Sequence, residues 1–336
     1  MATYRAIEVA PDGSLAATER ELVEPEAGQV LVRVEACGIC HTDSVAVNPH
    51  PETEPGRVPG HEIVGRIAAL GAGVTNWSVD DRVGVGFLGG HCGVCEQCRR
   101  GNFTNCADQP RTGVSVDGGY AEYLYARQSG LVAIPDALSA VDAAPLLCAG
   151  FTSYNGLLKA APKPGGLVAV QGIGGLGHLA VQYARAMGTQ VVAIARGTGK
   201  ADLARQLGAH HYVDSAATDP GKALRELGGA DVILATAASG SSMTALIPGL
   251  VHGGQLMVLG ASYEPIEITP MTLIFGGVRL AGSLTGTSIE NEDNLRFAVE
   301  QGVSAMVEKA DLAEAPAAYD RMMSGAARFR MVLTIA

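Results

Sequence analysis

The stretch that begins at Val168 places the strongest constraint on how this chain folds. A short apolar run, residues 168–171, ends in the turn Gly172-Ile173-Gly174-Gly175-Leu176-Gly177. After the turn, apolar residues recur at intervals of three and four, which is typical of one face of a helix. The first glycine allows the tight turn, the second lets the backbone approach a pyrophosphate, and the last lets the helix pack closely on the strand. Because a strand precedes the glycines and a helix follows them, the motif predicts a dinucleotide site with candidate contacts at Gly172, Gly174, Gly175, Leu176 and Gly177.

Runs of strand length continue to alternate with helical patterns after this motif. Together with the first run they lie at 166–171, 190–195, 211–214, 231–235, 255–259 and 278–282. This alternation predicts a doubly wound parallel sheet. The residues before about 135 instead predict short strands separated by turns, with Val30, Val32 and Val34 alternating as in a half-buried strand. Further helices are expected at 291–301 and 314–323, and a closing strand at 331–335.

Four cysteines gather within 15 residues, at spacings of three, three and eight. They are Cys92, Cys95, Cys98 and Cys106. Four thiolates can enclose one tetrahedral Zn²⁺ and leave no position for water, so this metal is expected to be structural. It would hold together a loop that has little apolar content of its own. His91 adjoins the cluster; the alternatives are support of the ligands from outside and an exposed side chain, and we expect the exposed one.

Two further motifs carry metal-binding residue types but are ambiguous alone. Cys37-Gly38-Ile39-Cys40 has the spacing of a redox pair, yet the β pattern before it lacks the strand–helix context that such a pair needs. Two buried thiols are the other interpretation. His61 and Glu62 follow a Pro-Gly turn, and taken by themselves they indicate a surface histidine and a solvated carboxylate.

Composition excludes several classes of partner. A net charge of −10 argues against nucleic acid and anionic membrane surfaces. We find no charged-then-apolar leader and no apolar run near roughly 18 residues, so we expect a cytoplasmic protein. In that compartment the clustering of the seven cysteines favours metal binding over disulfides. A length of 336 residues suggests two domains.

The motifs occur in a fixed order along essentially the whole chain. Cys-His-Thr-Asp at 40–43, Gly-His-Glu at 60–62, the four cysteines, Cys-Ala-Gly-Phe-Thr at 148–152 and the glycine turn follow one another. In this order they resemble the zinc-dependent medium-chain dehydrogenase/reductase family, most closely the tetrameric yeast and bacterial alcohol dehydrogenases. The resemblance implies an α/β protein with a GroES-like β-rich catalytic domain at 1–148 and 286–336, a structural zinc lobe at about 88–110 and a Rossmann coenzyme domain at 149–285. It also implies a homotetramer, with a dimer as second choice.

The resemblance further implies a role for individual residues. A catalytic zinc would be held by Cys40, His61 and Cys148, and three such ligands leave one position open. Glu62 would approach the metal during ligand exchange, Asp43 would accept the second ring N–H of the ligand histidine, and Thr42 would take the hydroxyl proton of the substrate. The remaining implied residues are His41 and Arg330 at the pyrophosphate, Thr152, Leu259 and Leu284 in the coenzyme site, and Thr42, Val47, Phe87 and Leu284 in the substrate pocket.

Three positions depart from the family pattern. Val45 stands where a histidine often ends the proton relay, so the proton would leave through ribose hydroxyls and water, or through His50. Ala195 stands where an acid would bind the ribose 2′-OH, which favours NADP(H) over NAD(H), with Arg196, Thr198 or Lys200 at the 2′-phosphate. The alternative is that Arg196 and Lys200 are merely solvated. Val47 replaces a tryptophan, which predicts tolerance of benzylic or medium-chain alcohols; core packing is the alternative for Val47 and Leu284.

These observations predict an NAD(P)-dependent alcohol dehydrogenase, or aldehyde/ketone reductase, with two zinc ions per chain. A quinone-type or enoyl reductase of the same fold would lack both sets of zinc ligands. A non-catalytic NAD(P)H-binding protein would be expected to have lost at least one ligand. Polyol dehydrogenation stays open, although that branch usually replaces the third ligand cysteine with a carboxylate.

Overall fold

The computed structural model describes residues 2–48 and 53–336. The chain divides into two compact units, Met1–Phe151 with Thr285–Ala336 and Thr152–Leu284. The sequence placed the corresponding boundaries at 148/149 and 285/286. In the structure the first boundary, between Phe151 and Thr152, falls within helix α4 (Ala149–Ala160). Among the described residues, no helix has the length and apolar character needed to span a membrane.

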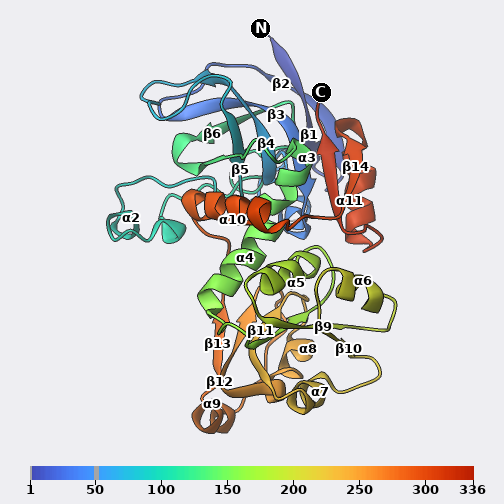
Figure 1. Cartoon of the computed structure of the whole chain (residues 1–336). Helices are drawn as coiled ribbons and strands as arrows, with labels where there is room; N and C mark the ends of the chain where they lie inside the picture. Colours follow the sequence, from blue (N-terminus) through green and yellow to red (C-terminus); the bar gives the residue numbers. More distant parts are fainter. Residues whose placement is uncertain (1, 49–52) are drawn as a thin grey trace. The chain divides into compact units, whose positions relative to one another are not determined.

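The first unit, coloured blue to green and red in Figure 1, is built on a largely antiparallel sheet. Its strands run in the order β14-β15-β3-β4-β5-β7, with β6 pairing on β3, and β1 and β2 form a separate hairpin. The strands are β1 (Thr3–Val9), β2 (Leu15–Glu21), β3 (Gln29–Ile39), β4 (Glu62–Leu70), β5 (Arg82–Val85), β6 (Tyr123–Arg127), β7 (Leu131–Ala133), β14 (Val307–Asp311) and β15 (Arg330–Thr334).

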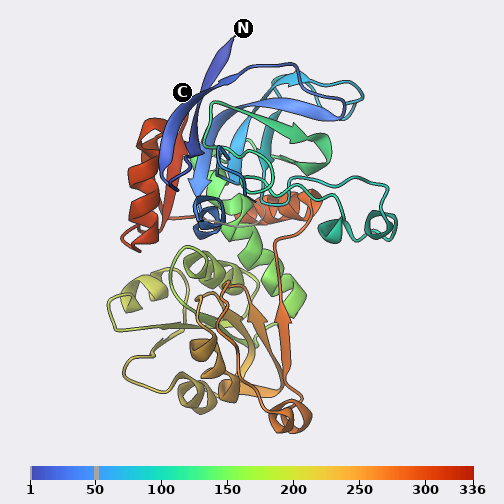
Figure 2. The ribbon, with the colours of Figure 1, turned by 180° about the vertical axis from the view of Figure 1, so that it is seen from behind.

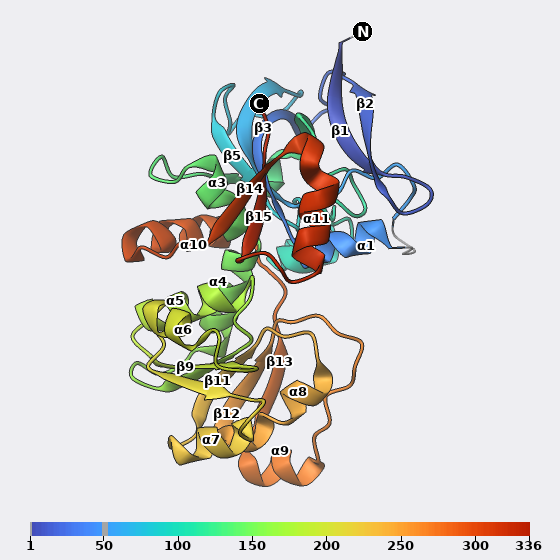
Figure 3. The ribbon, with the colours of Figure 1, turned by 90° about the vertical axis from the view of Figure 1, so that its right-hand side faces the viewer.

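Helices of the first unit are short apart from two near its C-terminal segment. α11 packs on β14 and β15, and this contact can be followed in Figure 3. The helices are α1 (Ser44–Val47), α2 (Glu96–Arg99), α3 (Ala140–Ala143), α10 (Ser288–Gln301) and α11 (Ala315–Met323). One hydrophobic core joins the sheet to α11, because buried residues of β3, β4 and β15 meet Ala315 and Ala318.

The second unit is a six-stranded parallel sheet in the order β10-β9-β8-β11-β12-β13. The strands are β8 (Leu167–Gln171), β9 (Gln190–Ala195), β10 (His211–Asp214), β11 (Ala230–Ala235), β12 (Leu250–Val258) and β13 (Arg279–Gly282). Between them lie α5 (Gly177–Ala186), α6 (Ala201–Gln206), α7 (Pro220–Glu226), α8 (Gly240–Thr244) and α9 (Pro270–Gly276). In Figure 3, α5 and α6 lie on one face of this sheet and α8 on the other. The predicted doubly wound parallel sheet is therefore confirmed.

One strand begins well before the sequence pattern suggests. β12 starts at Leu250, five residues ahead of the expected start at 255. Leu250 pairs with Ala230, but the next paired residue on β12 is Gln255, opposite Val232. Gly253, with a φ of +78°, lies in this irregularity. The glycines and the shift in register conceal the strand from a search for regular alternation.

Candidate metal centres and coenzyme site

Strand pairing brings together the residues of the predicted catalytic metal site. β3 and β4 run antiparallel with Gly38 opposite Glu62, so Cys40, just after β3, lies beside His61, just before β4. Cys148 follows the short helical turn Ala144–Leu147, which contacts both strands. The ligand atoms of Cys40, His61, Glu62 and Cys148 all lie within 4.8 Å of one another. All four side chains are buried, so the interpretation of His61 and Glu62 as a surface pair is wrong.

The cluster has the ligand atoms, and the spacing between them, that a zinc site requires. Nδ1 of His61 lies 2.9 Å from Oδ1 of Asp43, and Nε2 has no hydrogen-bond partner among the described residues. The Sγ atoms of Cys40 and Cys148 lie 4.0 Å apart. A tetrahedral site with Zn–S bonds near 2.3 Å requires a sulfur–sulfur distance of roughly 3.8 Å. Two thiols and one orphaned, buried imidazole nitrogen therefore fit a three-ligand zinc site.

The electrostatics of the cluster favour a thiolate at one of the two sulfurs. A hydrogen bond from Cys148 lowers the pKa of the Cys40 thiol, and the neighbouring His61 and Arg330 act in the same direction. A thiolate is the form in which cysteine binds a metal. The second thiol, that of Cys148, then has its pKa raised by the same hydrogen bond and by burial. A divalent cation would relieve this repulsion between two buried thiolates.

Glu62 forms an ion pair with a buried arginine. Nη2 of Arg330 donates to Oε1 of Glu62 at 2.5 Å and to the carbonyl oxygen of Ile39 at 2.9 Å. Burial raises the pKa of the Glu62 carboxyl to about 7, and Arg330 opposes the rise. The other carboxylate oxygen, Oε2, has no hydrogen-bond partner among the described residues. A Cβ at Gly38 would overlap this oxygen, so only glycine fits opposite the carboxylate.

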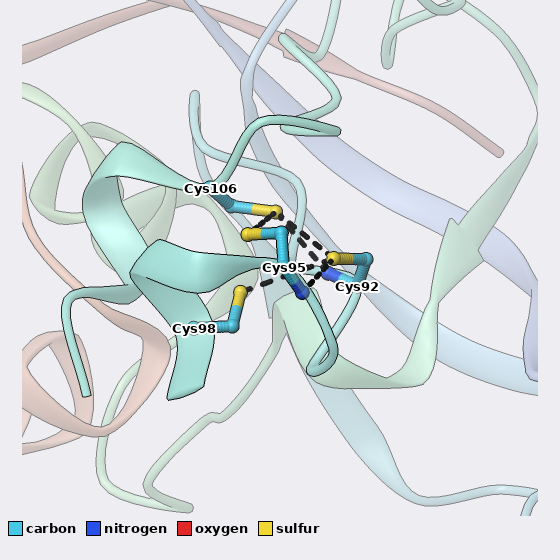
Figure 4. A group of neighbouring side chains, drawn as sticks. All are labelled: Cys92, Cys95, Cys98 and Cys106. Carbon is cyan, nitrogen blue, oxygen red and sulfur yellow. Dashed lines mark hydrogen bonds between the residues drawn. The ribbon is translucent and has the colours of Figure 1, made fainter. Parts of the chain in front are cut away.

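The four cysteines of the predicted structural site converge in a loop that includes α2. Figure 2 shows this loop, in teal, extending from the sheet of the first unit. In Figure 4 the four sulfurs face a common centre. The Sγ atom of Cys92 lies 3.6 Å from that of Cys106 and 4.0 Å from that of Cys98, while Cys95 and Cys106 are 4.0 Å apart. These spacings also match the tetrahedral value of roughly 3.8 Å.

Backbone N–H groups prepare this loop for a cation. Hydrogen bonds from the backbone of Ala107 and Cys98 lower the pKa of the Cys95 thiol to about 6. Thiolate is thereby favoured before any metal enters. His91 differs from its prediction: its ring is half-buried and stacks on Phe103, with centroids 4.3 Å apart. The aromatic contact shields part of the ring from solvent, and nothing in the residue's position in the sequence indicates it.

The glycine turn of the second unit has the geometry expected of a phosphate-binding loop. Gly172 has a φ of +87°, which only glycine adopts without strain. A Cβ at Gly177 would overlap the carbonyl oxygen of Gly172, because the start of α5 packs directly on the turn. A Cβ at Gly174 would meet nothing within 4 Å. The backbone at Gly174 therefore borders open space that a diphosphate can occupy, at the N-terminal end of α5.

The loop after β9 is fixed by the neighbouring strand. β9 ends at Ala195, and Arg196 is exposed. Gly197 donates its N–H to Oδ1 of Asp214 at 2.7 Å, and its carbonyl accepts from the Tyr212 hydroxyl at 2.6 Å. Nζ of Lys200 donates to the carbonyl of Ile173 in the glycine turn at 2.7 Å. The alternative that Lys200 is merely solvated is therefore wrong, since it joins the two loops of this site.

Comparisons with known proteins agree with this architecture. Residues 26–136 match the family model of the alcohol dehydrogenase GroES-like domain, and residues 175–300 match that of the zinc-binding dehydrogenases. Alcohol dehydrogenase patD from Penicillium expansum is 42% identical over 317 residues, covering 94% of this chain and 93% of the relative. An alcohol dehydrogenase from Geobacillus stearothermophilus is 42% identical over 311 residues, covering 92% of each. The solved structure of a cinnamyl alcohol dehydrogenase from Sorghum bicolor has 33% identity and a TM-score of 0.91, covering 99% of this chain and 98% of that one.

The chain belongs to the zinc-type alcohol dehydrogenases. The family resemblance and the predicted fold class are thus both confirmed. As a member of this family, the protein is an oxidoreductase that transfers hydride between an alcohol and a nicotinamide coenzyme. The β-rich unit of this alcohol dehydrogenase carries both cysteine sets, and the parallel-sheet unit carries the glycine turn.

Two other predicted residues of this alcohol dehydrogenase, Thr42 and Phe87, lie near the catalytic cluster. Oγ1 of Thr42 is 3.7 Å from Sγ of Cys40, and the Phe87 ring meets the His61 ring edge to face at 5.3 Å. Val47 is half-buried against the hydrophobic core of the first unit, as its core-packing alternative requires. Leu284 is 57% exposed, so core packing does not explain it.

The roles assigned to the coenzyme contacts stay predictions. His41 is exposed, and Thr152 is half-buried at the start of the second unit. Arg330, predicted to contact the pyrophosphate, is only 3% exposed and binds Glu62. Leu259 lies directly after β12 and is half-buried. His50, the alternative end of the proton relay, lies outside the described residues.

Sequence reasoning missed one residue that the structure places beside the metal site. Tyr120 is fully buried, and its hydroxyl donates to Oδ2 of Asp43 at 2.8 Å. Burial raises the pKa of Tyr120 well above its ordinary value, so its hydroxyl keeps its proton. The two glycines before it are the only signal in the sequence, since they allow a close approach that other residues would block.

Proposed function

We propose that this alcohol dehydrogenase interconverts alcohols bulkier than ethanol with their aldehydes or ketones, and that NADP(H) is its preferred coenzyme. The observation that carries the choice of coenzyme is the end of β9. Ala195 supplies no carboxylate there, and the exposed guanidinium of Arg196 follows it. An acid at this position holds the ribose 2′-OH and repels a 2′-phosphate, whereas arginine binds phosphate with two parallel N–H donors.

Two zinc ions per chain complete the proposal. Cys40, His61 and Cys148 would hold the catalytic ion and leave its fourth position open for substrate oxygen. Cys92, Cys95, Cys98 and Cys106 would hold the structural ion with every position filled. The catalytic ion supplies Lewis-acid stabilisation of an alkoxide, or polarisation of a carbonyl in the reverse direction.

The proton of the substrate hydroxyl would pass first to Thr42. Its hydroxyl lies 3.7 Å from Sγ of Cys40, and it can accept one proton while it donates another. Val45 cannot continue a relay, because its side chain is apolar. The proton would therefore leave Thr42 through the ribose hydroxyls of the coenzyme and water, with no protein histidine at position 45.

The proposed substrate range rests on the small side chain of Val47 in α1 and on the aromatic ring of Phe87 beside the catalytic cluster. Val47 leaves more volume than the tryptophan of the yeast enzymes. The edge-to-face contact of Phe87 with His61 places an aromatic surface beside the metal ligands, where it can pack against a benzylic ring. The similarity to an enzyme named for cinnamyl alcohol supports the same class of substrate.

A second copy of this chain is the proposed protein partner, first as a homotetramer and otherwise as a dimer. β13 pairs with β12 on one side and ends the parallel sheet on the other. Apolar side chains are exposed on α9 next to it, with Ile274 at 70% and Phe275 at 69%. An edge strand beside an apolar face is a surface that proteins usually cover. Light scattering of the wild type and of Phe275→Asp tests this, and a monomeric wild type would refute it.

A reducing compartment, the cytoplasm, is the proposed location. All seven cysteines are free thiols. Six of them lie in the two metal-binding clusters, and oxidation of either cluster would destroy its zinc site. Fractionation of the native host, with zinc content measured in each fraction, tests the location.

Initial rates with benzyl alcohol test the proposed function, with NAD⁺ and NADP⁺ compared at equal concentration. We expect faster turnover with NADP⁺. Arg196→Gln should raise the KM for NADP⁺ about tenfold or more and leave the KM for NAD⁺ unchanged, since a hydrogen bond to a charged group contributes about 1.5–3 kcal/mol. Arg205→Gln, at another exposed arginine of the same unit, is the matched control. A clear preference of the wild type for NAD⁺ would refute the assignment of coenzyme, and no turnover by zinc-replete enzyme with either would refute the substrate class.

A further inference from the structure

A buried carboxylate links Tyr120 to two ligands of the catalytic metal site. Oδ2 of Asp43 accepts hydrogen bonds from the Tyr120 hydroxyl at 2.8 Å and from the backbone N–H of Cys40 at 2.9 Å. The other oxygen, Oδ1, lies 2.9 Å from Nδ1 of His61. Asp43 is 1% exposed, so these protein groups take the place of water around it. Tyr120 is therefore one of three groups that fix the position of the carboxylate.

Tyr120 also braces the backbone that leads into His61. Its N–H donates to the carbonyl of Pro59 at 3.0 Å, and the N–H of Gly119 donates to the carbonyl of Gly60 at 3.1 Å. Gly60 has a φ of +100°, and a Cβ there would come within 2.5 Å of Cδ1 of Tyr120. The tyrosine ring thus packs directly on the residue before the ligand histidine. The same side chain therefore contacts both the residue before His61 and the carboxylate beside its Nδ1.

We propose that Tyr120 is a positioning residue of the catalytic metal site, which through Asp43 holds the His61 ring so that Nε2 faces the metal. The inference rests on the proposed zinc site at Cys40, His61 and Cys148. Hydrogen-bonded carboxylates beside ligand histidines fix the tautomer and orientation of the ring, and their loss weakens metal binding. Tyr120 extends this arrangement by one residue, because it fixes the carboxylate itself.

Tyr120→Phe removes the hydroxyl and keeps the ring that packs on Gly60. Oδ2 of Asp43 then retains only the N–H of Cys40, so the carboxylate is held at fewer points and the His61 ring less firmly. We expect zinc to leave the catalytic site about tenfold faster, at the lower end of the 10- to 100-fold effect of changes in such outer partners. Tyr125→Phe is the matched control, because that hydroxyl donates to the carbonyl of Val23 at 2.8 Å on an exposed part of the same unit.

Zinc release to a chromogenic chelator measures this effect without any substrate or coenzyme. The structural lobe serves as an internal reference in the same molecule, and Cys40→Ser, which should keep one zinc per chain, identifies its release phase. We expect Tyr120→Phe to accelerate only the other phase, and Tyr125→Phe to change neither. Equal release from Tyr120→Phe and wild type would overturn the proposal, and so would equal acceleration of both phases, which indicates general loosening of the fold.

Two further results separate this inference from the proposed function. If Cys40→Ser contains as much zinc per chain as the wild type, the catalytic zinc site itself is refuted. If that site is present, Tyr120→Phe in an Asp43→Asn background should add less than a twofold change, since both substitutions act through the same carboxylate. A full tenfold effect in that background would show that Tyr120 does not act through Asp43.

Discussion

Replacement of Arg330 by methionine should destabilise the first unit far more than loss of an ordinary ion pair. Arg330 is 3% exposed and Glu62 is fully buried, and Nη2 serves both this carboxylate and the carbonyl of Ile39. Methionine fills similar volume but leaves the buried Glu62 carboxyl without its cation and without the donor to Oε1. Breaking such a pair costs about 3–5 kcal/mol. At an m-value of roughly 3 kcal/mol/M, the midpoint of urea unfolding should fall by about 1–2 M.

The assay and its control both come from the first unit. Trp77 is the only tryptophan and packs against the core of that unit, so its fluorescence reports unfolding there. Arg66→Met removes another arginine–carboxylate pair, Arg66 with Glu35 at 3.1 Å, from β4 itself. That pair is partly exposed to solvent, and its loss should cost no more than about 1 kcal/mol.

A double variant identifies the buried charge as the cause. Arg330→Met combined with Glu62→Gln removes both charges, so most of the lost free energy of unfolding should return. All variants are compared at the same zinc occupancy, because zinc near Glu62 would contribute its own charge. An Arg330→Met variant that unfolds at the same urea concentration as Arg66→Met would refute the reasoning.

Three other predictions follow from the described contacts. Gly177→Ala should lower the free energy of unfolding by about 3 kcal/mol or more, because the added Cβ would overlap the carbonyl of Gly172. It should also abolish coenzyme binding, measured by NADPH fluorescence, and normal binding would contradict the prediction. Cys98→Ser should lower the zinc content from two per chain to one and reduce the melting temperature, and unchanged zinc content would exclude the four-cysteine site. Glu308→Gln tests a pH effect: the hydrogen bond from Arg321 lowers the pKa of Glu308, so the wild type should be more stable by less than about 1 kcal/mol at pH 7. The difference should disappear as the pH falls through the lowered pKa and the carboxyl takes up a proton. A difference that grows toward low pH would reverse the sign of the argument.

Features set by short stretches of chain could be predicted from the sequence, and features set by strand pairing could not. The four cysteines of the lobe lie within 15 residues, so their spacing alone indicates one metal. The glycine turn between β8 and α5 is equally local. Cys40 and Cys148 are 108 residues apart, and only the family resemblance connected them before the structure placed their sulfurs 4.0 Å apart.

Side chains that act on other side chains are only weakly indicated by the sequence pattern. Tyr120 follows two glycines in a β-rich stretch and cannot be told from an ordinary core tyrosine by its sequence context. Its hydrogen bond to Asp43 spans 77 residues and depends on the pairing of 118–120 with 58–60. The sequence allows Lys200 to be a phosphate ligand or a solvated cation, and its hydrogen bond to Ile173 depends on where two loops meet.

The pairing of β15 with β3 imposes an order of events on a chain that is still being made. Glu62 leaves the ribosome 268 residues before Arg330, the cation that it needs. At about 5–20 residues per second, this interval lasts roughly 13–54 s. During that time the coenzyme unit can already complete its parallel sheet, whereas the seven-stranded sheet lacks β14 and β15. The catalytic cluster is therefore the last part of the nascent enzyme to close, and newly made molecules should acquire their structural zinc before their catalytic one.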